Sequence, residues 1–448
     1  MKNFKISFIG LGFVGLSTAV VIAKKGFKTI GVDKDESKIN SLKKIKSPFF
    51  EPNLKNYLEG STGNGNLKFT TQITEDVLGS DIIFVCVGTP TKQNGNIDLS
   101  YLKQVSKDLA NKVRKFSKKK HLVVIKSTII PETTKKEVIP IFKDLIIAKK
   151  VNVVTNPEFL REGQAIKDVL KPHLIVIGEY GNEGTKILER FYEKVYGKEI
   201  AEIIKTDPTT AEMIKYANNS FLATKISFIN SLANICQRLP GTDINIIANA
   251  IGRDPRIGSL FLQSGPGFGG SCLPKDVTAL VNFSRKFKND SDILLNAVRE
   301  VNKRQPQKII NLLEDNELIK QGNIISILGL AFKKNTDDIR EAVSLDIVKE
   351  LLKKNVKIKV HDPMAVYNFK KIFAKKIQYS ERVRDCISNS DVCIILTEWD
   401  EYKKLKPNDF IELMNKPNLI DARRIFDSKK FENKLNYFAI GYNIKRNV

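Results

Sequence analysis

The chain has 448 residues, enough for two or three domains that each bury a sizeable apolar core. Its net charge is +24, but the lysines are spread along the chain instead of clustering with aromatic residues, so we expect no nucleic-acid binding and a basic surface that attracts anionic nucleotides. No apolar run approaches the roughly 18 residues that cross a membrane, and no leader pattern precedes the first strand, so we expect a cytoplasmic protein without membrane segments.

The chain begins with an apolar strand that runs directly into Gly10-x-Gly12-x-x-Gly15 and an alanine- and valine-rich helix. These glycines permit a tight turn and let a pyrophosphate approach the helix N-terminus, where free N–H groups favour anions. The next strand ends in Asp33, at the distance expected for a carboxylate that binds a ribose. Because Asp33 would repel a 2′-phosphate, we predict NAD in preference to NADP, with Lys38 close to the cofactor.

Residues 1 to about 150 alternate between apolar runs and helical patterns, which is typical of a parallel sheet with helical crossovers. Two buried strands in this region are followed by hydroxyl residues, Thr89 and Thr128. Ligands of doubly wound sheets lie beyond the carboxyl ends of the strands. We therefore place both threonines near the cofactor, with an ordinary turn or cap role as the alternative.

A further strand leads into Asn-Pro-Glu-Phe-Leu-Arg-Glu-Gly, residues 156–163. Glu158 and Glu162 are four residues apart, with Arg161 between them. On a helical turn the two carboxylates would share one face, which two anions avoid unless a ligand, water or cation lies between them. A solvated loop face is the alternative.

From about Thr209 a helical pattern continues through Asn234, and we expect this long helix to join two lobes. Lys215 and Asn219 are one turn apart and share a face. A lysine and an amide that project together can bind a hydroxyl or stabilise a developing oxyanion. An exposed helix face is the alternative.

The segment Gly-Phe-Gly-Gly-Ser-Cys-Leu-Pro-Lys-Asp, residues 267–276, places three glycines just before Cys272. A helix that begins near Pro274 would bring Asp276 close to the thiol. A thiolate beside an acid/base group is how enzymes form covalent acyl intermediates, whereas a buried small hydrophobe is the other reading of a lone cysteine. The chain has five cysteines, an odd number mostly within apolar runs, so we expect neither a disulfide framework nor a metal site. Together with a dinucleotide site, Cys272 suggests oxidation beyond the aldehyde.

Residues from about 315 to 448 read as a second, degenerate copy of the first domain. Of the three glycines only Gly329 remains, while the strand that ends in Asp362 matches the one that ends in Asp33. A dinucleotide would not be held as in the first copy, but a nucleotide could use the basic residues Lys333 and Arg340.

Taken in order, GLGFVG, NPEFLREG, EMIKYANNS, RIG, GFGGSCLPKD and LAFKKNTDDIRE resemble the motifs of the UDP-glucose/GDP-mannose dehydrogenase family over nearly the whole chain. The resemblance implies an α/β fold with an NAD-binding Rossmann domain (1–205), a central helical dimerisation region that carries the cysteine loop (206–312), and a UDP-sugar-binding, degenerate Rossmann-like domain (313–448). It also implies a homodimer or higher homo-oligomer.

The implied reaction is the NAD-dependent, four-electron oxidation of UDP-glucose to UDP-glucuronate through a thiohemiacetal and a thioester. GDP-mannose or a UDP-N-acetylhexosamine is the alternative substrate. A non-catalytic nucleotide-sugar binding protein is the alternative from another class.

The resemblance also assigns site residues. Cys272 is the nucleophile, and Arg256 reaches the sugar from a neighbouring subunit. The catalytic set is Cys272, Lys215, Asn219, Asp276, Glu158 and Thr128. The expected cofactor contacts are Gly10, Gly12, Gly15, Asp33, Lys38, Thr89, Thr128, Glu162, Lys275 and Arg340. The expected substrate contacts are Glu158, Phe159, Leu160, Arg161, Glu162, Lys215, Asn219, Arg256, Phe261, Gly267, Phe268, Gly269 and Lys333.

Overall fold

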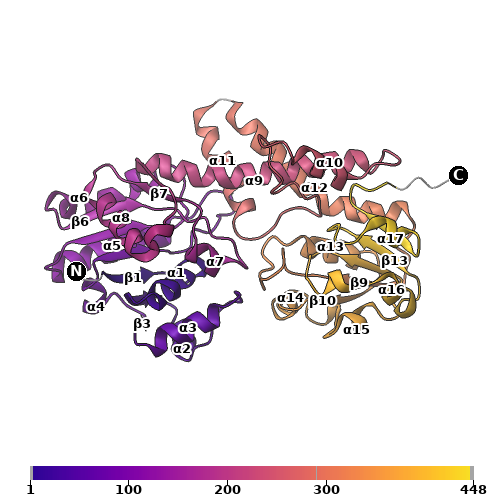
Figure 1. Ribbon diagram of the computed structural model, residues 1–448, viewed down its shortest axis with the longest axis horizontal. Coiled ribbons are helices and arrows are strands. Elements are labelled where there is room, and N and C mark those ends of the chain that lie inside the picture. The colour runs from indigo at the N-terminus through magenta and orange to yellow at the C-terminus, as the bar shows by residue number, and fades with distance from the viewer. Residues whose placement is uncertain (1–3, 289, 444–448) are drawn as a thin grey trace. The chain divides into compact units, whose positions relative to one another are not determined.

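The computed structural model describes residues 4–288 and 290–443. The chain divides into two compact units, and the division falls between Asn218 and Asn219. Each unit is built around one sheet, which consists of β1 to β8 in the first unit and β9 to β14 in the second (Figure 1).

The sheet of the first unit has the strand order β3-β2-β1-β4-β5-β6-β7-β8. The parallel sheet predicted for residues 1 to about 150 is confirmed, because β1 to β6 pair in parallel, whereas β7 pairs antiparallel with β6 through Thr155 and Gly178. The order of β1 to β6 is that of dinucleotide-binding sheets. The strands are β1 Lys5–Ile9, β2 Lys28–Val32, β3 Leu67–Thr70, β4 Ile82–Val85, β5 His121–Ile125, β6 Val151–Thr155, β7 Ile175–Gly178 and β8 Ile203–Thr206.

Helices cover both faces of this sheet because its central strands are apolar on both sides. Phe8 and Phe84 are register partners on β1 and β4, and their rings stack at 4.8 Å in a core with α1 and α8. Ile83 and Val123 point to the other face, where α5 and α6 pack. The helices are α1 Phe13–Lys24, α2 Glu36–Lys43, α3 Leu54–Gly63, α4 Glu75–Leu78, α5 Ser100–Phe116, η1 Thr134–Val138, α6 Ile139–Ile147, α7 Ala165–Leu170, α8 Glu183–Tyr196 and η2 Gly197–Glu199.

The predicted long helix is confirmed as α9, Pro208–Cys236, which continues through the division between the units. In the second unit, its last turns share one apolar core with α10, α12 and the second sheet. The remaining helical elements before that sheet are α10 Ile244–Ile251, α11 Leu273–Ser284, η3 Arg285–Phe287, η4 Asp290–Asp292 and α12 Ile293–Asp315.

The second sheet repeats the topology of the first, with the parallel order β11-β10-β9-β12-β13-β14. Its strands are β9 Ile324–Leu328, β10 Lys357–His361, β11 Gln378–Tyr379, β12 Val392–Ile395, β13 Asn418–Asp421 and β14 Asn436–Ala439. Its helices are α13 Val343–Leu352, α14 Val366–Phe373, η5 Ala374–Lys376, α15 Val383–Ile387, η6 Tyr402–Lys404, α16 Pro407–Leu413 and α17 Ser428–Glu432.

The second copy uses the positions that match those of the first copy, Gly329 and Asp362, for internal packing. Gly329 has φ of +102°, and a Cβ there would lie 2.5 Å from the backbone N of Thr397. Asp362, the counterpart of Asp33, is buried and accepts hydrogen bonds from the backbone N–H of Leu330 (2.7 Å) and from the indole of Trp399 (3.0 Å). The carboxylate at the end of β10 therefore binds its own domain.

In the part of the chain that the structure describes, no helix is both long and apolar enough to cross a bilayer.

Candidate active site

The loop between β1 and α1 requires glycine at two of its three predicted positions. Gly10 has φ of +95°, and a Cβ there would lie 2.8 Å from the backbone of Cys86. A Cβ on Gly15 would lie 1.9 Å from the carbonyl oxygen of Gly10. A Cβ on Gly12, the residue just before α1, would instead meet no described atom within 4 Å. A phosphate therefore has room at the start of α1, and the loop fits the pyrophosphate of a dinucleotide.

Asp33 follows β2 and is ionised. Its Oδ2 accepts from the N–H of Leu11 (2.9 Å) and from Lys38 Nζ (2.7 Å), and its Oδ1 accepts from the N–H of Asp35. Burial opposes ionisation, but these hydrogen bonds outweigh it and lower the pKa of Asp33. Lys38 is thus the ion-pair partner of Asp33, the residue predicted to bind the ribose. A direct contact of Lys38 with the cofactor stays a prediction.

Thr89 and Thr128 join the loops that follow β4 and β5. The Thr89 hydroxyl donates to the carbonyl oxygen of Thr128 at 2.7 Å, and the Ser127 hydroxyl donates to that of Val87 at 2.7 Å. Both loops lie at the carboxyl edge of the sheet, where the cofactor of such a fold is expected.

The segment after β6 is an extended loop over residues 156–161, so the predicted helical face shared by Glu158 and Glu162 is wrong. Pro157 cannot donate a helical hydrogen bond. Glu158 Oε2 instead accepts from the N–H of Leu160 at 2.6 Å, a local contact that competes with helix formation. Arg161 binds Asp168 with its side chain (2.6 Å) and its backbone N–H (2.9 Å), which ties the loop to α7.

Two predicted catalytic residues of the first unit form a buried ion pair. Glu158 Oε1 lies 3.2 Å from Lys215 Nζ, and the lysine also lies over the ring of Phe159 at 5.3 Å. The loop after β6 and the first turns of α9 thus bring a carboxylate and an ammonium together. Such a pair can exchange a proton with, or donate a hydrogen bond to, an oxygen of a bound substrate.

In the second unit, Asn219 and Asp276 are hydrogen-bonded to each other. Asn219 Nδ2 donates to Asp276 Oδ2 at 2.7 Å, and Lys275 Nζ lies 2.5 Å from Oδ1 of the same carboxylate. The helix predicted near Pro274 is confirmed as α11. Cys272 immediately precedes it and is partly exposed, with its Sγ 3.5 Å from the Ser271 hydroxyl.

The glycine loop before Cys272 lies directly against other backbone of its unit. The N–H of Gly270 donates to the carbonyl of Arg340 at 2.9 Å, and a Cβ on Gly269 would lie 2.2 Å from the carbonyl oxygen of Glu341. Asn302 accepts from the N–H of Phe268 (2.8 Å) and donates to its carbonyl (2.9 Å). The close approach explains why positions 269 and 270 of this loop are glycine.

Comparison with known proteins identifies the relatives of this arrangement. Residues 4–196, 209–304 and 326–428 match, in that order, the NAD binding domain, the central domain and the UDP binding domain of the UDP-glucose/GDP-mannose dehydrogenase family. A UDP-glucose 6-dehydrogenase of Rickettsia conorii is 39% identical over 444 residues, which cover 98% of this chain and 100% of the relative. The chain belongs to the UDP-glucose/GDP-mannose dehydrogenase family.

Solved structures of family members share the fold. A UDP-glucose dehydrogenase from Pyrobaculum islandicum superposes with a TM-score of 0.90 at 33% identity, covering 98% of each chain. A UDP-D-ManNAc dehydrogenase from Pyrococcus horikoshii superposes with a TM-score of 0.81 at 26% identity, covering 98% of this chain and 99% of the other. Family membership confirms the predicted fold class and makes the protein an NAD-dependent dehydrogenase.

Two residues predicted from the family resemblance, Arg256 and Arg340, lie at the surface of the second unit, whereas Lys333 is half-buried. Arg256 is 88% exposed and pairs with Asp254, two residues before it. Arg340 forms the same kind of pair with Asp338, and Lys333 Nζ lies 5.4 Å from the ring of Phe332. These contacts hold the side chains locally, and their roles toward ligands stay predictions, as do those of Phe261, Gly267 and Glu162.

Sequence reasoning missed two buried charged residues near the family motifs. Glu51 accepts from the N–H groups of Gly163 (2.7 Å) and Ala165 (2.8 Å) and so anchors the end of the loop after β6. Lys126, directly after β5, donates to the side-chain oxygen of Asn156 at 3.0 Å. A lysine that ends an otherwise apolar buried strand was the available signal for the second of these.

Proposed function

We propose that this protein converts UDP-glucose, two NAD and water into UDP-glucuronate, two NADH and protons. The observation that carries the proposal is the 39% identity, over all of the relative and 98% of this chain, to a protein named UDP-glucose 6-dehydrogenase. Bound NAD supplies the hydride acceptor, and the glycine loop at Gly12 and the ionised Asp33 would hold its pyrophosphate and ribose.

The covalent steps belong to Cys272. After the first hydride leaves C6, the Cys272 thiolate would add to the aldehyde carbon to give a thiohemiacetal. Loss of the second hydride would give a thioester, and water would release the carboxylate and regenerate the thiol. The partly exposed position of Cys272 at the start of α11 supports this role.

The polar residues around the site would act on two oxygen atoms, the one on C6 of the sugar and that of the hydrolytic water. Lys215 and Asn219 would stabilise negative charge on the C6 oxygen, and Thr128 would complete the set. Glu158, 3.2 Å from Lys215, or Asp276, which accepts from Asn219, would activate the hydrolytic water.

The substrate is testable with a panel of nucleotide sugars. We expect the highest kcat/KM for UDP-glucose, and lower values for UDP-N-acetylmannosamine and GDP-mannose, which are the alternatives within the family. If UDP-N-acetylmannosamine or GDP-mannose gave the highest kcat/KM, the protein would instead be a dehydrogenase for that nucleotide sugar. Tight binding without NADH formation from any of them would favour the non-catalytic alternative.

We further propose a homodimer or higher oligomer built on α9. Phe221, Phe228 and Ile235 repeat every seven residues on this helix and are 64%, 53% and 55% exposed. A seven-residue repeat keeps side chains on one face of a helix, and an exposed apolar stripe of this kind suits the same stripe of a second copy. If Arg256 acts across the interface, mixing Arg256→Ala with Cys272→Ala should restore part of the activity that each lacks, whereas a fully active monomer would exclude the idea.

The proposed place of action is the cytoplasm. The mechanism requires Cys272 as a free thiol, and the reducing cytosol keeps thiols in that form.

A further inference from the structure

The first unit holds a buried cation that the proposed chemistry does not use. Lys126 is 8% exposed, and its Nζ donates to the amide oxygen of Asn156 at 3.0 Å. Among the described residues, no carboxylate lies within ion-pair distance of this nitrogen. Burying an ammonium against a neutral amide is unfavourable, so its presence next to the family motif at Asn156 calls for a functional explanation.

The backbone fixes the position of Lys126 relative to this motif. Ile125 and Thr155 are register partners on the adjacent strands β5 and β6, so Lys126 and Asn156 leave the sheet side by side. The N–H of Asn156 donates to the carbonyl of Ile125 at 2.8 Å, and its side-chain amide donates to the carbonyl of Val176 at 2.7 Å. Glu158 follows Asn156 by two residues, so this anchor also positions the Glu158 carboxylate.

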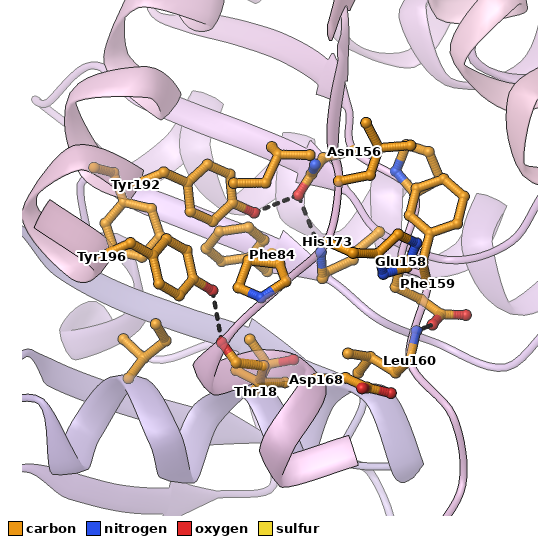
Figure 2. A pocket seen from close by; sticks show the side chains of 18 residues that line it. Thr18, Phe84, Asn156, Glu158, Phe159, Leu160, Asp168, His173, Tyr192 and Tyr196 are labelled. Carbon is orange, nitrogen blue, oxygen red and sulfur yellow. Dashed lines mark hydrogen bonds between the residues drawn. The ribbon is translucent and has the colours of Figure 1, made fainter. Parts of the chain in front are cut away.

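Asn156 accepts a second hydrogen bond, from the Tyr192 hydroxyl at 2.5 Å (Figure 2). The same close-up shows Tyr192, Asn156 and Glu158 around one cavity. The cavity has a volume of about 50 Å³, and Lys126 also lines it. A cavity of this size has room for a few water molecules, which would complete the donor capacity of Lys126.

Titratable groups face this region from each neighbouring element. They are Cys86 after β4, Lys126 after β5, Glu158 after β6, Asp168 on α7, His173 before β7, Tyr192 and Tyr196 on α8, and Lys215 on α9. Burial raises the pKa of Cys86 to about 12 and raises those of both tyrosines, so these groups are neutral. Asp168 is paired with Arg161. Glu158 therefore faces two lysines, Lys215 and Lys126.

Burial lowers the pKa of Lys126, whereas the charge of Glu158 raises it. The attraction is mutual, so the positive charge of Lys126 also acts on the Glu158 carboxylate.

We infer that Lys126 is a positioning residue for Glu158, which holds the loop at Asn156 in place and adds a second positive charge, beside that of Lys215, near the Glu158 carboxylate. This inference rests on the proposed function only in taking Glu158 as part of the catalytic set.

The test compares the pH dependence of kcat/KM in variants of this network. Lys126→Met removes the positive charge of the lysine, so the acid limb of the kcat/KM pH profile should move to higher pH by roughly one unit. Asn156→Asp places a carboxylate against Lys126 and neutralises the positive charge of the lysine, so this variant should move the acid limb of the pH profile in the same direction. Tyr192→Phe is the matched control, because it removes the other hydrogen bond to the same amide oxygen and leaves the charge intact, so the limb should stay in place.

The outcomes separate charge from packing. If Lys126→Met lowers kcat/KM by the same factor at every pH, or if Tyr192→Phe moves the limb as far, the inference is wrong. Should Lys126→Met fail to fold, Lys126→Gln and Asn156→Asp decide the question by the same criterion. An unsubstituted protein that forms no NADH from any nucleotide sugar would instead contradict the proposed function.

Discussion

At the scale of single residues, Cys272 differs from the other four cysteines in its access to solvent. Cys86, Cys236, Cys386 and Cys393 are buried, and burial raises the pKa values of Cys86 and Cys386 to about 12. Such thiols stay protonated and unreactive. Cys272 is partly exposed and lies at the start of α11, where the helix dipole favours a thiolate.

Substitutions of Cys272 should therefore affect chemistry more than stability. We expect Cys272→Ala to lower turnover by roughly a thousandfold or more while NAD binding is retained. Cys272→Ser should accumulate an ester, visible as a mass increase equal to the uronyl nucleotide, because an alkoxide is a poorer leaving group than a thiolate. The control Cys386→Ala should cost about 1 kcal/mol of stability and little rate. Near wild-type turnover by Cys272→Ala would rule out the covalent role.

The Asp33–Lys38 pair predicts a change in cofactor preference. Asp33→Ala removes the carboxylate that repels a 2′-phosphate and frees Lys38, its partner at 2.7 Å, to bind that phosphate. The ratio of kcat/KM for NAD over NADP should fall by roughly tenfold or more. Adding Lys38→Ala should reverse part of the gain with NADP. Equal use of both cofactors by the unsubstituted protein would show that Asp33 does not face the ribose.

Glu212 predicts a pH-dependent stability. It lies one turn before Lys215, is 2% exposed, and accepts from the N–H of Thr134 at 2.8 Å, while its Oε2 has no hydrogen-bond partner among the described residues. Burial raises its pKa from 4.5 to about 7, against the hydrogen bond from Thr134. As pH rises through this window the unfolded chain loses a proton that the folded chain keeps, so the folded protein loses stability.

Glu212→Gln removes this titration and keeps the acceptor for Thr134. At pH 8 the variant should be more stable than the unsubstituted protein, by up to roughly 3 kcal/mol, and at pH 5 the two should be similar. Thermal unfolding at both pH values measures the effect, and Glu317→Gln on the surface is the control. A difference in Tm that is the same at both pH values would contradict the assignment.

At the scale of elements, the cysteine loop is positioned by backbone contacts rather than by its own side chains. Gly269 and Gly270 lie against residues 340–341, and Asn302 on α12 holds both the N–H and the carbonyl of Phe268. The loop, α12 and the segment after β9 therefore set the position of Cys272 together.

A methyl group on this loop should displace it. A Cβ on Gly269 would lie 2.2 Å from the carbonyl oxygen of Glu341, which is backbone and cannot rotate away. We expect Gly269→Ala to lower kcat at least roughly tenfold, because small displacements of a nucleophile are costly. The control is Gly63→Ala at the end of α3, where a Cβ meets no described atom within 4 Å and the rate should not change. Unchanged kcat in Gly269→Ala would show that the loop tolerates displacement.

The sequence predicted the elements whose patterns are local. The glycine loop after β1, the long helix α9, the helix that begins near Pro274 and the repeated sheet all follow from periodicity and turn residues, and the structure has them. The segment 156–161 was predicted wrongly because the four-residue spacing of Glu158 and Glu162 suggested a helix, whereas Pro157 and the contact to Leu160 keep it extended. Lys126 and Glu51 escaped prediction because their importance depends on partners far along the chain.

At the scale of the whole molecule, the two copies of one topology have different uses. In the first copy a Cβ on Gly12 would face open space, and Asp33 keeps 10% of its side chain exposed. In the second copy a Cβ on Gly329 would clash with Thr397, and the Asp362 carboxylate accepts hydrogen bonds from residues of its own domain. Both observations agree with the match of this region to a UDP binding domain instead of a second NAD binding domain. A net charge of +24 would favour the approach of both anionic ligands.

The central claim is that one chain carries out both oxidations, with the intermediate held on Cys272. The most direct measurement is the amount of NADH formed per UDP-glucose consumed, with the products analysed in the same reaction. The account predicts two NADH for each UDP-glucuronate and no free aldehyde. One NADH per UDP-glucose, with the aldehyde accumulating in solution, would contradict it.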